Sequence, residues 1–290
     1  MSFASEISVV STDLGPIEFR RIGKGSPILY FHGGQSDARN ETFDNVFDLT
    51  RYELIIPTRP GYGKTPLGHH KSPEDTARLV ERLVDQLGLP AAALIGVSLG
   101  ARAAIAFAAL FPRRSRSLLL SAPVAGQWMT PKDRRRAMAH AFYNPAVEGA
   151  SWSMTRLAFA TAPRTCASLF VRGVSTRQIE TLSKDDISRL RARIGSYRSR
   201  RGFLADLNQT LSDECLRKVK CPTLIQHSLH DASVEVEQAR LAARLIPASE
   251  LRLYDNACGH FLWLGPGSAE VFSDVRHFVE DDIAERMAAE

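Results

Sequence analysis

A serine between two glycines is the residue of this chain best suited to chemistry. Residues 96–100 read Gly-Val-Ser-Leu-Gly, after an apolar run at residues 91–95 and before an alanine-rich helical pattern at residues 99–111. This spacing predicts a tight strand-to-helix turn that exposes the Ser98 hydroxyl as a nucleophile. The flanking glycines have a steric reason, because so tight a turn leaves no room for a Cβ between strand and helix.

A nucleophilic serine needs a base, and the base needs an acid that orients it. On a turn of this kind, the acid and then the base follow the serine along the chain. His260, which follows Gly259 on a loop after a strand pattern, is the predicted base. Asp231, on the loop after the strand pattern at residues 223–226, is the predicted acid. The alternatives that residue type alone leaves open are His227, His230 and Asp255.

The second predicted feature is an oxyanion hole, since acyl transfer passes through a tetrahedral oxyanion that two backbone N–H groups usually hold. An apolar strand pattern at residues 27–31 runs into His32-Gly33-Gly34. We predict the amides of Gly34 and Leu99 as the two donors, Leu99 because it follows the nucleophile at a helix N-terminus. A glycine turn without a catalytic role is the alternative for residues 32–34.

With these motifs the chain resembles the α/β-hydrolase fold family, in its small single-domain branch with a helical cap. The resemblance rests on His32-Gly33-Gly34, the run Arg-Pro-Gly-Tyr-Gly-Lys-Thr at residues 59–65, the turn at residues 96–100, Asp231 and Gly259-His260. It implies Ser98, Asp231 and His260 as the catalytic triad, Gly34 and Leu99 as oxyanion donors, and neither a metal nor an organic cofactor. The chain departs from the family's pattern at Gln35, Thr58 and Ala101, where proline, aspartate and glycine are common.

The elements that must position these residues alternate between strand and helix. The expected strands are residues 7–10, 17–22, 28–31, 54–57, 92–95, 117–121, 223–226 and 251–254, and the expected helices are residues 73–87, 99–111, 234–245 and 269–285. A hairpin across residues 13–16 would join the first two strands. The later alternation predicts an α/β fold with a mostly parallel eight-stranded sheet and helices on both faces.

One long block interrupts the alternation. Residues 126–220 contain helical patterns but no convincing strand. We therefore predict a core domain of residues 1–125 and 216–290, and a helical cap (lid) of residues 126–215 over the serine. The predicted substrate-binding residues are Trp128, Phe142, Trp152, Phe261 and Trp263. For the rings of the cap, packing within the cap itself is the alternative.

Composition and charge agree with one enzyme-sized domain. The 290 residues are 44% hydrophobic, carry a net charge of +5 and contain no apolar run long enough to span a membrane. The first residues lack the pattern of a signal peptide and the four cysteines form no zinc spacing, so we expect a cytoplasmic protein.

Residues 126–220 hold 18 basic and 8 acidic residues. A solvated basic surface is the favoured explanation of this excess, and the alternative is that it steers an anionic substrate to the cap. Nucleic acid is not an expected partner, because no recognition module accompanies the charge.

The sequence therefore predicts a serine hydrolase that cleaves a small carboxylic ester or related acyl compound through an acyl-enzyme. A carbon–carbon bond hydrolase, a lactonase and a cofactor-free perhydrolase are alternatives on the same triad. A ligand receptor on a hydrolase fold is the alternative from another class, and turnover would distinguish it. The oligomeric state stays open.

Overall fold

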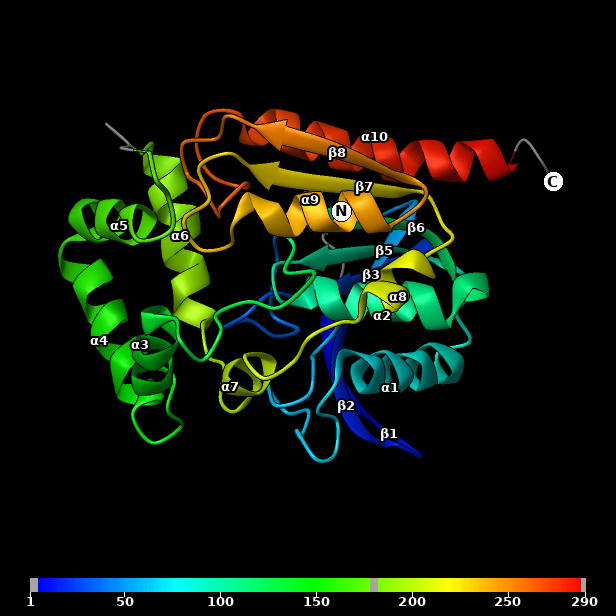
Figure 1. Cartoon of the computed structure of the whole chain (residues 1–290), viewed down its shortest axis with the longest axis horizontal. Coiled ribbons are helices and arrows are strands. Elements are labelled where there is room, and N and C mark those ends of the chain that lie inside the picture. Colours follow the sequence, from blue (N-terminus) through cyan, green and yellow to red (C-terminus); the bar gives the residue numbers. More distant parts are fainter. Residues whose placement is uncertain (1–4, 178–181, 288–290) are drawn as a thin grey trace.

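The computed structural model describes residues 5–177 and 182–287 of the chain. Eight strands form one sheet in the order β1-β2-β4-β3-β5-β6-β7-β8. Figure 1 shows this sheet with helices packed against it. β1 and β2 form an antiparallel hairpin, and β2 also runs antiparallel to β4, whereas the remaining neighbours are parallel. The predicted mostly parallel eight-stranded sheet is confirmed. The first four residues, on which the expected absence of a signal peptide partly rests, lie outside the described residues.

All eight expected strands are present, and each is slightly longer than the sequence pattern. Their bounds are β1 (Glu6–Thr12), β2 (Gly15–Gly23), β3 (Ser26–Phe31), β4 (Tyr52–Pro57), β5 (Ala92–Val97), β6 (Ser115–Ser121), β7 (Thr223–Ser228) and β8 (Ser249–Tyr254). The inner strands form because they are continuous apolar runs, as a sheet covered on both faces requires. In β3, Leu29 and Phe31 pack into the core on one face, while Ile28 and Tyr30 pack into the core on the other.

Helices cover both faces of this sheet. The first face carries α1 (Pro73–Gln86), α2 (Gly100–Leu110), α8 (Asp213–Arg217) and α9 (Val236–Leu245), and the second carries α10 (Ser268–Met287). α1 begins at a capping box in which Ser72 and Asp75 exchange hydrogen bonds. A short 3₁₀ turn, Pro112–Arg114, leads from α2 into β6. The expected layers of an α/β fold are thus in place.

The segment between β6 and β7 is helical in its described part. It holds α3 (Arg134–Phe142), α4 (Glu148–Thr161), α5 (Pro163–Arg172), α6 (Lys184–Ser196) and α7 (Gly202–Asp206) before α8. Figure 1 shows α3 to α6 as a group beyond the ends of the strands. The expected cap boundary at residue 215 falls inside α8, whose Cys215 and Leu216 pack into the sheet's core. Residues 126–215 are called the cap segment below.

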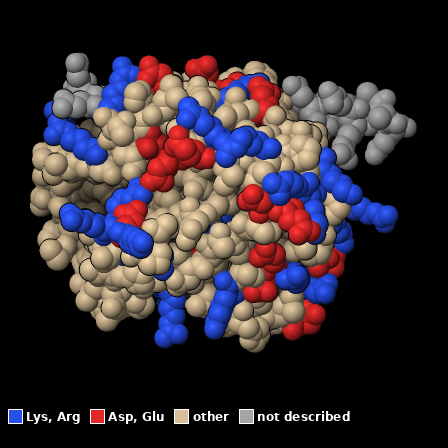
Figure 2. Space-filling model, in the orientation of Figure 1, with Lys and Arg blue, Asp and Glu red and all other residues tan. Residues whose placement is uncertain are grey.

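Charged side chains are spread over the surface. Figure 2 shows Lys and Arg interspersed with Asp and Glu on the face in view, rather than gathered into one continuous basic area. Within the described residues, no helix combines the length and the apolar composition needed to cross a bilayer.

Candidate active site

Ser98 stands on a strained turn between β5 and α2. Its φ of 51° lies in the left-handed region that side chains other than glycine rarely adopt. A Cβ on Gly96 would lie 2.7 Å from the Cβ of Ala104, and one on Gly100 would lie 2.3 Å from the Phe31 carbonyl oxygen. Both flanking glycines are therefore required by the close packing of strand on helix, as the sequence pattern predicted.

Three predicted residues meet at the carboxyl ends of the strands. The Nε2 of His260 lies 3.0 Å from the Oγ of Ser98, and its Nδ1 lies 2.7 Å from Oδ2 of Asp231. Ser98 is 8% exposed, and the side chains of His260 and Asp231 are 14% and 0% exposed. The structure thus joins residues 98, 231 and 260 into one chain of hydrogen bonds, whose geometry permits proton transfer from the serine to the imidazole.

The acid is held by the backbone that follows it. Oδ1 of Asp231 accepts hydrogen bonds from the amides of Ser233 and Val234, at 2.8 and 2.9 Å. The other carboxylate oxygen, Oδ2, is hydrogen-bonded to Nδ1 of His260. His227 lies beside this carboxylate, but its Nε2 is hydrogen-bonded to the Val234 carbonyl at 3.0 Å, and burial lowers the pKa of its imidazole. A neutral His227 leaves the negative charge of Asp231 to act on His260.

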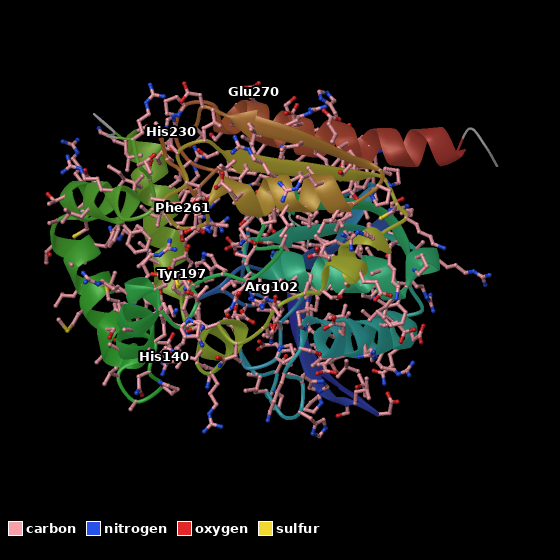
Figure 3. The ribbon with its side chains drawn as sticks, in the orientation of Figure 1. Arg102, His140, Tyr197, His230, Phe261 and Glu270 are labelled. Carbon is pink, nitrogen blue, oxygen red and sulfur yellow. The ribbon has the colours of Figure 1, made fainter. Side chains whose placement is uncertain are left out.

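His230 and Asp255, which residue type alone would allow as base and acid, lie away from Ser98. They form a hydrogen bond of 2.6 Å with each other, and the Asp255 side chain is 67% exposed. Arg177 also donates to Asp255, and the hydrogen bonds from His230 and then Arg177 lower the pKa of Asp255. Figure 3 shows His230 near the upper edge of the molecule, where its carbonyl accepts a hydrogen bond from the Thr176 amide of the cap segment at 2.8 Å. This group is a surface ion cluster.

The two predicted oxyanion donors lie on adjoining backbone. Gly100 is needed because the end of β3 lies against the start of α2. This close packing also places Gly34 next to Leu99. Gly34 lines the same cavity as Ser98. Neither the Gly34 amide nor the Leu99 amide donates a hydrogen bond within the part of the chain that the structure describes. Both N–H groups are therefore available to an oxyanion formed at Ser98.

The cap segment contacts the loop that carries Gly34. The carbonyl of Gln35 accepts a hydrogen bond from the Arg198 amide at 2.9 Å, and its side chain lies near the Tyr143 hydroxyl. Gln35 itself has a φ of 58°. Where many members of the resembled family place a rigid proline, this chain ties the loop to the cap segment instead.

A cavity of about 80 Å³ adjoins Ser98 and His260. Its walls come from the sheet, the loop after β8 and α6, and they include Tyr30, Gln226, Phe261, Trp263, Arg193 and Tyr197. A wider groove of about 820 Å³ shares Arg193, Tyr197 and Trp263 with this cavity. Figure 3 shows Phe261 and Tyr197 between the cap segment and the sheet. A small group bound beside Ser98 can therefore extend into a roomier groove.

Only two of the five predicted substrate-binding residues line this cavity, namely Phe261 and Trp263. Trp152 is 2% exposed within the cap segment's own core, where its Nε1 donates to Glu148. Trp128 packs against Phe203 and donates to the Ser233 carbonyl, and Phe142 packs edge-on against Trp152. None of these three rings lines the cavity beside Ser98: Trp152 and Trp128 are buried in separate apolar clusters, and Phe142 is 37% exposed.

Arg193 is a charged wall residue that was not among the predicted substrate-binding residues. Its guanidinium stacks 4.1 Å from the ring centre of Trp263 and donates to the Thr42 hydroxyl. No carboxylate of the described residues lies within ion-pair distance of it. The sequence shows a dense run of arginines over residues 189–201, but the helical phase that turns one of them toward the site depends on how α6 packs.

Among the described residues, no group of three His, Cys, Asp or Glu side chains is arranged to hold a metal ion.

Known proteins resemble the chain over most of its length. A sequence model of the alpha/beta hydrolase family matches residues 28–275. An uncharacterized hydrolase, YcgS, of Bacillus subtilis (strain 168) is 32% identical over 94% of this chain and 98% of its own. The 2-hydroxy-6-oxo-2,4-heptadienoate hydrolase of Pseudomonas putida is 24% identical over 83% of this chain and 84% of its own. The structure of an alpha/beta hydrolase fold protein from Nakamurella multipartita, 26% identical, superposes with a TM-score of 0.79 over 94% of this chain and 99% of that one.

Proposed function

Because the chain belongs to the alpha/beta hydrolase family, we propose that it is a serine hydrolase that cleaves a small carboxylic ester or related acyl compound. Ser98 is the nucleophile, His260 the base and Asp231 the acid. The observation that carries the proposal is the continuous hydrogen-bonded chain from Ser98 through His260 to Asp231, at 3.0 and 2.7 Å. A binding protein on this fold would have no need of that connection.

Each group of the site has one task in this reaction. His260 takes the proton of Ser98 as its Oγ attacks the acyl carbon, and Asp231 stabilises the imidazolium that forms. The amides of Gly34 and Leu99 hold the oxyanion, each worth about 3 kcal/mol of the barrier. His260 then protonates the leaving group, and in the second half it activates the water that hydrolyses the acyl-enzyme.

The walls of the cavity favour a substrate with a negative charge. Arg193 is half-buried, faces both the small cavity and the wider groove, and is held in place by Trp263 and Thr42. Its charge is offset by no neighbouring carboxylate among the residues described. A carboxylate or similar anion on the substrate can supply that partner, since guanidinium groups bind planar anions in a bidentate way.

Carbon–carbon bond hydrolysis is the second candidate. The Pseudomonas putida relative is named a 2-hydroxy-6-oxo-2,4-heptadienoate hydrolase, and its substrate is therefore a carboxylate. Arg193 beside the triad suits such a substrate. Against it, Phe261 follows the predicted base where hydrolases of this kind commonly carry tryptophan. Lactonase and perhydrolase activities would begin from the same attack by Ser98.

We further propose that residues 126–215 act as the cap over this site, on a core of residues 1–125 and 216–290. The contact of Arg198 with Gln35, and the position of Arg193 in the cavity wall, support this role. The cap would exclude water from the acyl-enzyme and shape the groove for the leaving group.

Turnover of p-nitrophenyl acetate and butyrate at neutral pH tests the proposal. The wild-type protein should turn over repeatedly, and Ser98→Ala should abolish turnover. Ser153→Ala, a change at an exposed serine of α4, is the matched control and should retain full activity. Equal turnover in Ser98→Ala and wild type would refute the proposed nucleophile. Absence of ester turnover in the wild type, with cleavage of a 2-hydroxy-6-oxo-dienoate, would favour the second candidate.

A further inference from the structure

The short helix α7 is packed unusually closely against the loop of residues 59–63. The amide of Gly202 donates to the Gly61 carbonyl at 3.0 Å. A Cβ on Gly202 would lie 2.1 Å from the ring of Tyr62, and one on Gly61 would lie 2.8 Å from the Cα of Gly202. α7 therefore sits at a fixed distance from this loop, and its last residue, Asp206, is held at a defined place in the interior.

Asp206 makes an ion pair that is closed off from solvent. Its two carboxylate oxygens accept hydrogen bonds from Nη1 of Arg59 at 2.9 and 2.8 Å, and one of them also accepts from the Tyr62 hydroxyl at 2.7 Å. Asp206, Arg59 and Tyr62 are 3%, 3% and 0% exposed. A buried ion pair is weak evidence for stability, because desolvation offsets most of its attraction. A role in positioning other groups is the better explanation.

The remaining donors of Arg59 hold the loop that precedes Gly34. Its Nε donates to the His32 carbonyl at 2.9 Å and its Nη2 to the Gly33 carbonyl at 3.1 Å. The Arg59 amide donates to Nε2 of His32 at 3.0 Å, so that the His32 proton is on Nδ1, 2.8 Å from the Gly33 carbonyl. Burial and the Arg59 charge hold the pKa of His32 well below its usual value, which preserves this neutral form.

The Gly33 carbonyl and the Gly34 amide belong to one planar peptide group, and in a trans peptide they point in opposite directions. Two donors fix the direction of that carbonyl, and they therefore fix the direction of the Gly34 N–H. We propose that Asp206 is a positioning residue, which holds Arg59 so that the Gly33–Gly34 peptide presents its N–H to the oxyanion. This inference rests on the proposed function and adds that the oxyanion hole depends on a residue of the cap segment.

The backbone of Asp206 is also hydrogen-bonded to α2, the helix that follows Leu99, the other proposed oxyanion donor. Its carbonyl accepts a hydrogen bond of 2.9 Å from Nη1 of Arg102, and Nη2 of the same side chain donates to the Gly126 carbonyl at 2.6 Å. Arg102 lies in α2, the helix that begins just after Leu99, and Figure 3 shows it there. Burial lowers the pKa of Arg102 to about 10, so its guanidinium stays charged near neutral pH. Asp206 thus connects the supports of both amide donors.

The test compares kcat with KM in Asp206→Asn, which keeps the size of the side chain and removes its charge. A small displacement of one donor should lower kcat about 10²-fold, as is found for misplaced catalytic groups, while KM changes less than about threefold. The inhibition constant of butylboronic acid, which forms a tetrahedral adduct on a nucleophilic serine, should rise by a similar factor. The inhibition constant of butyrate should stay the same. Asp213→Asn on the exposed face of α8 is the matched control and should behave as wild type.

Asp206→Asn leaves the Arg59 charge buried without its partner and can fail to fold for that reason alone. The double change Arg59→Met with Asp206→Leu removes both charges and keeps the site apolar. It should fold, as judged by its melting temperature, and it should show the same loss of kcat. Tyr62→Phe leaves the ion pair intact and should lower kcat less than about threefold.

Three results would overturn the inference. One is wild-type kcat in folded Asp206→Asn or in the double variant. The second is an equal weakening of butylboronic acid and butyrate binding, which indicates general damage to the cavity rather than a misplaced donor. The third is a wild-type protein without Ser98-dependent turnover, which removes the proposed function as well. The first two leave Ser98-dependent turnover in the wild type intact, so the two failures are distinguishable.

Discussion

The strand ends and the cap segment bury their acidic side chains for different purposes. At the strand ends, Asp231 is buried beside a histidine and serves the proposed chemistry. In the cap segment, Glu148, Asp186 and Asp206 are only 1%, 5% and 3% exposed, although basic residues dominate this part of the chain. Every Lys and Arg of residues 126–220 is exposed or half-buried. These three acids of the cap segment are therefore interior residues, whereas its basic residues lie at or near the surface.

Each of these buried carboxylates binds a segment that is distant from it in the sequence. Glu148 accepts hydrogen bonds from the amides of Ser199 and Arg200 and from the Ser199 hydroxyl, at 2.5, 2.9 and 2.6 Å. Asp186 accepts from the Gly265 amide at 3.1 Å, on the loop that also carries His260. Asp206 binds Arg59. We therefore expect different effects when a buried acid is replaced. At the strand ends, the replacement should lower kcat. Where the acid binds only the backbone of the cap segment, it should mainly lower the free energy of unfolding.

The largest effect is expected at the strand ends, for Asp231→Asn. An asparagine there keeps its oxygen toward the amides of Ser233 and Val234 and turns its NH₂ toward His260, which forces the wrong imidazole tautomer. We expect kcat for p-nitrophenyl butyrate to fall about 10⁴-fold, with little change in melting temperature. The surface change Asp255→Asn is the control. A loss of less than tenfold would mean that Asp231 is not the acid of the site.

The opposite pattern is expected for Glu148→Gln in the cap segment. The new NH₂ faces backbone donors that need an acceptor, so the free energy of unfolding in urea should fall by about 1–3 kcal/mol. The kcat of the folded enzyme should stay within a few-fold of wild type. Glu237→Gln, at an exposed position of α9, is the control. Unchanged stability with a large loss of kcat would break the distinction between the two kinds of acid.

Arg193→Met tests whether this basic residue of the cap segment selects for a negatively charged substrate. Removing the guanidinium should lower the preference for monomethyl succinate over methyl butyrate about tenfold in kcat/KM, the usual scale of one charged hydrogen bond. Arg191→Met, exposed on the same helix, is the control. An equal loss for both esters would assign Arg193 a packing role on Trp263 rather than a role in charge selection.

The smallest expected effect is on the pH dependence of stability, and it arises from His227 at the strand ends. Burial lowers the pKa of His227 in the folded protein, so below its ordinary value of 6.5 the unfolded chain takes up a proton that the folded chain does not. Stability should therefore decrease as the pH falls below 6.5, by at most about 1.4 kcal/mol per pH unit from this group. Urea unfolding at pH 5.5 and 7.5 should show a smaller difference in His227→Gln than in wild type. The exposed His69→Gln should match wild type, and identical differences in all three proteins would contradict the prediction.

Much of the sheet was predictable because its signals are local. The inner strands are unbroken apolar runs, and the turn at Ser98 needs glycines at two defined positions. The order of serine, acid and base then limited the partners of Ser98, since Asp231 and His260 each follow a strand. The distances between these side chains follow from the way parallel strands end at one edge of the sheet.

The cap segment was less predictable because its contacts are remote in sequence. Arg59 and Asp206 are 147 residues apart, and neither is marked by local periodicity. Trp128, Phe142 and Trp152 looked like cavity walls, but Trp128 and Trp152 pack into apolar clusters and Phe142 is largely on the surface. The departure at Gln35 was visible in the sequence, whereas its attachment to Arg198 depended on the folded cap segment.

One carbonyl joins the loops of the proposed acid and base. The oxygen of Val174, just after α5, accepts hydrogen bonds from the amides of Ala232 and His260, each at 3.1 Å. Any opening of the cap segment at this point frees both N–H groups at once. Hydrogen–deuterium exchange at residues 232 and 260 should therefore proceed with matched protection factors, and the two amides together would report how often the cap segment detaches at Val174.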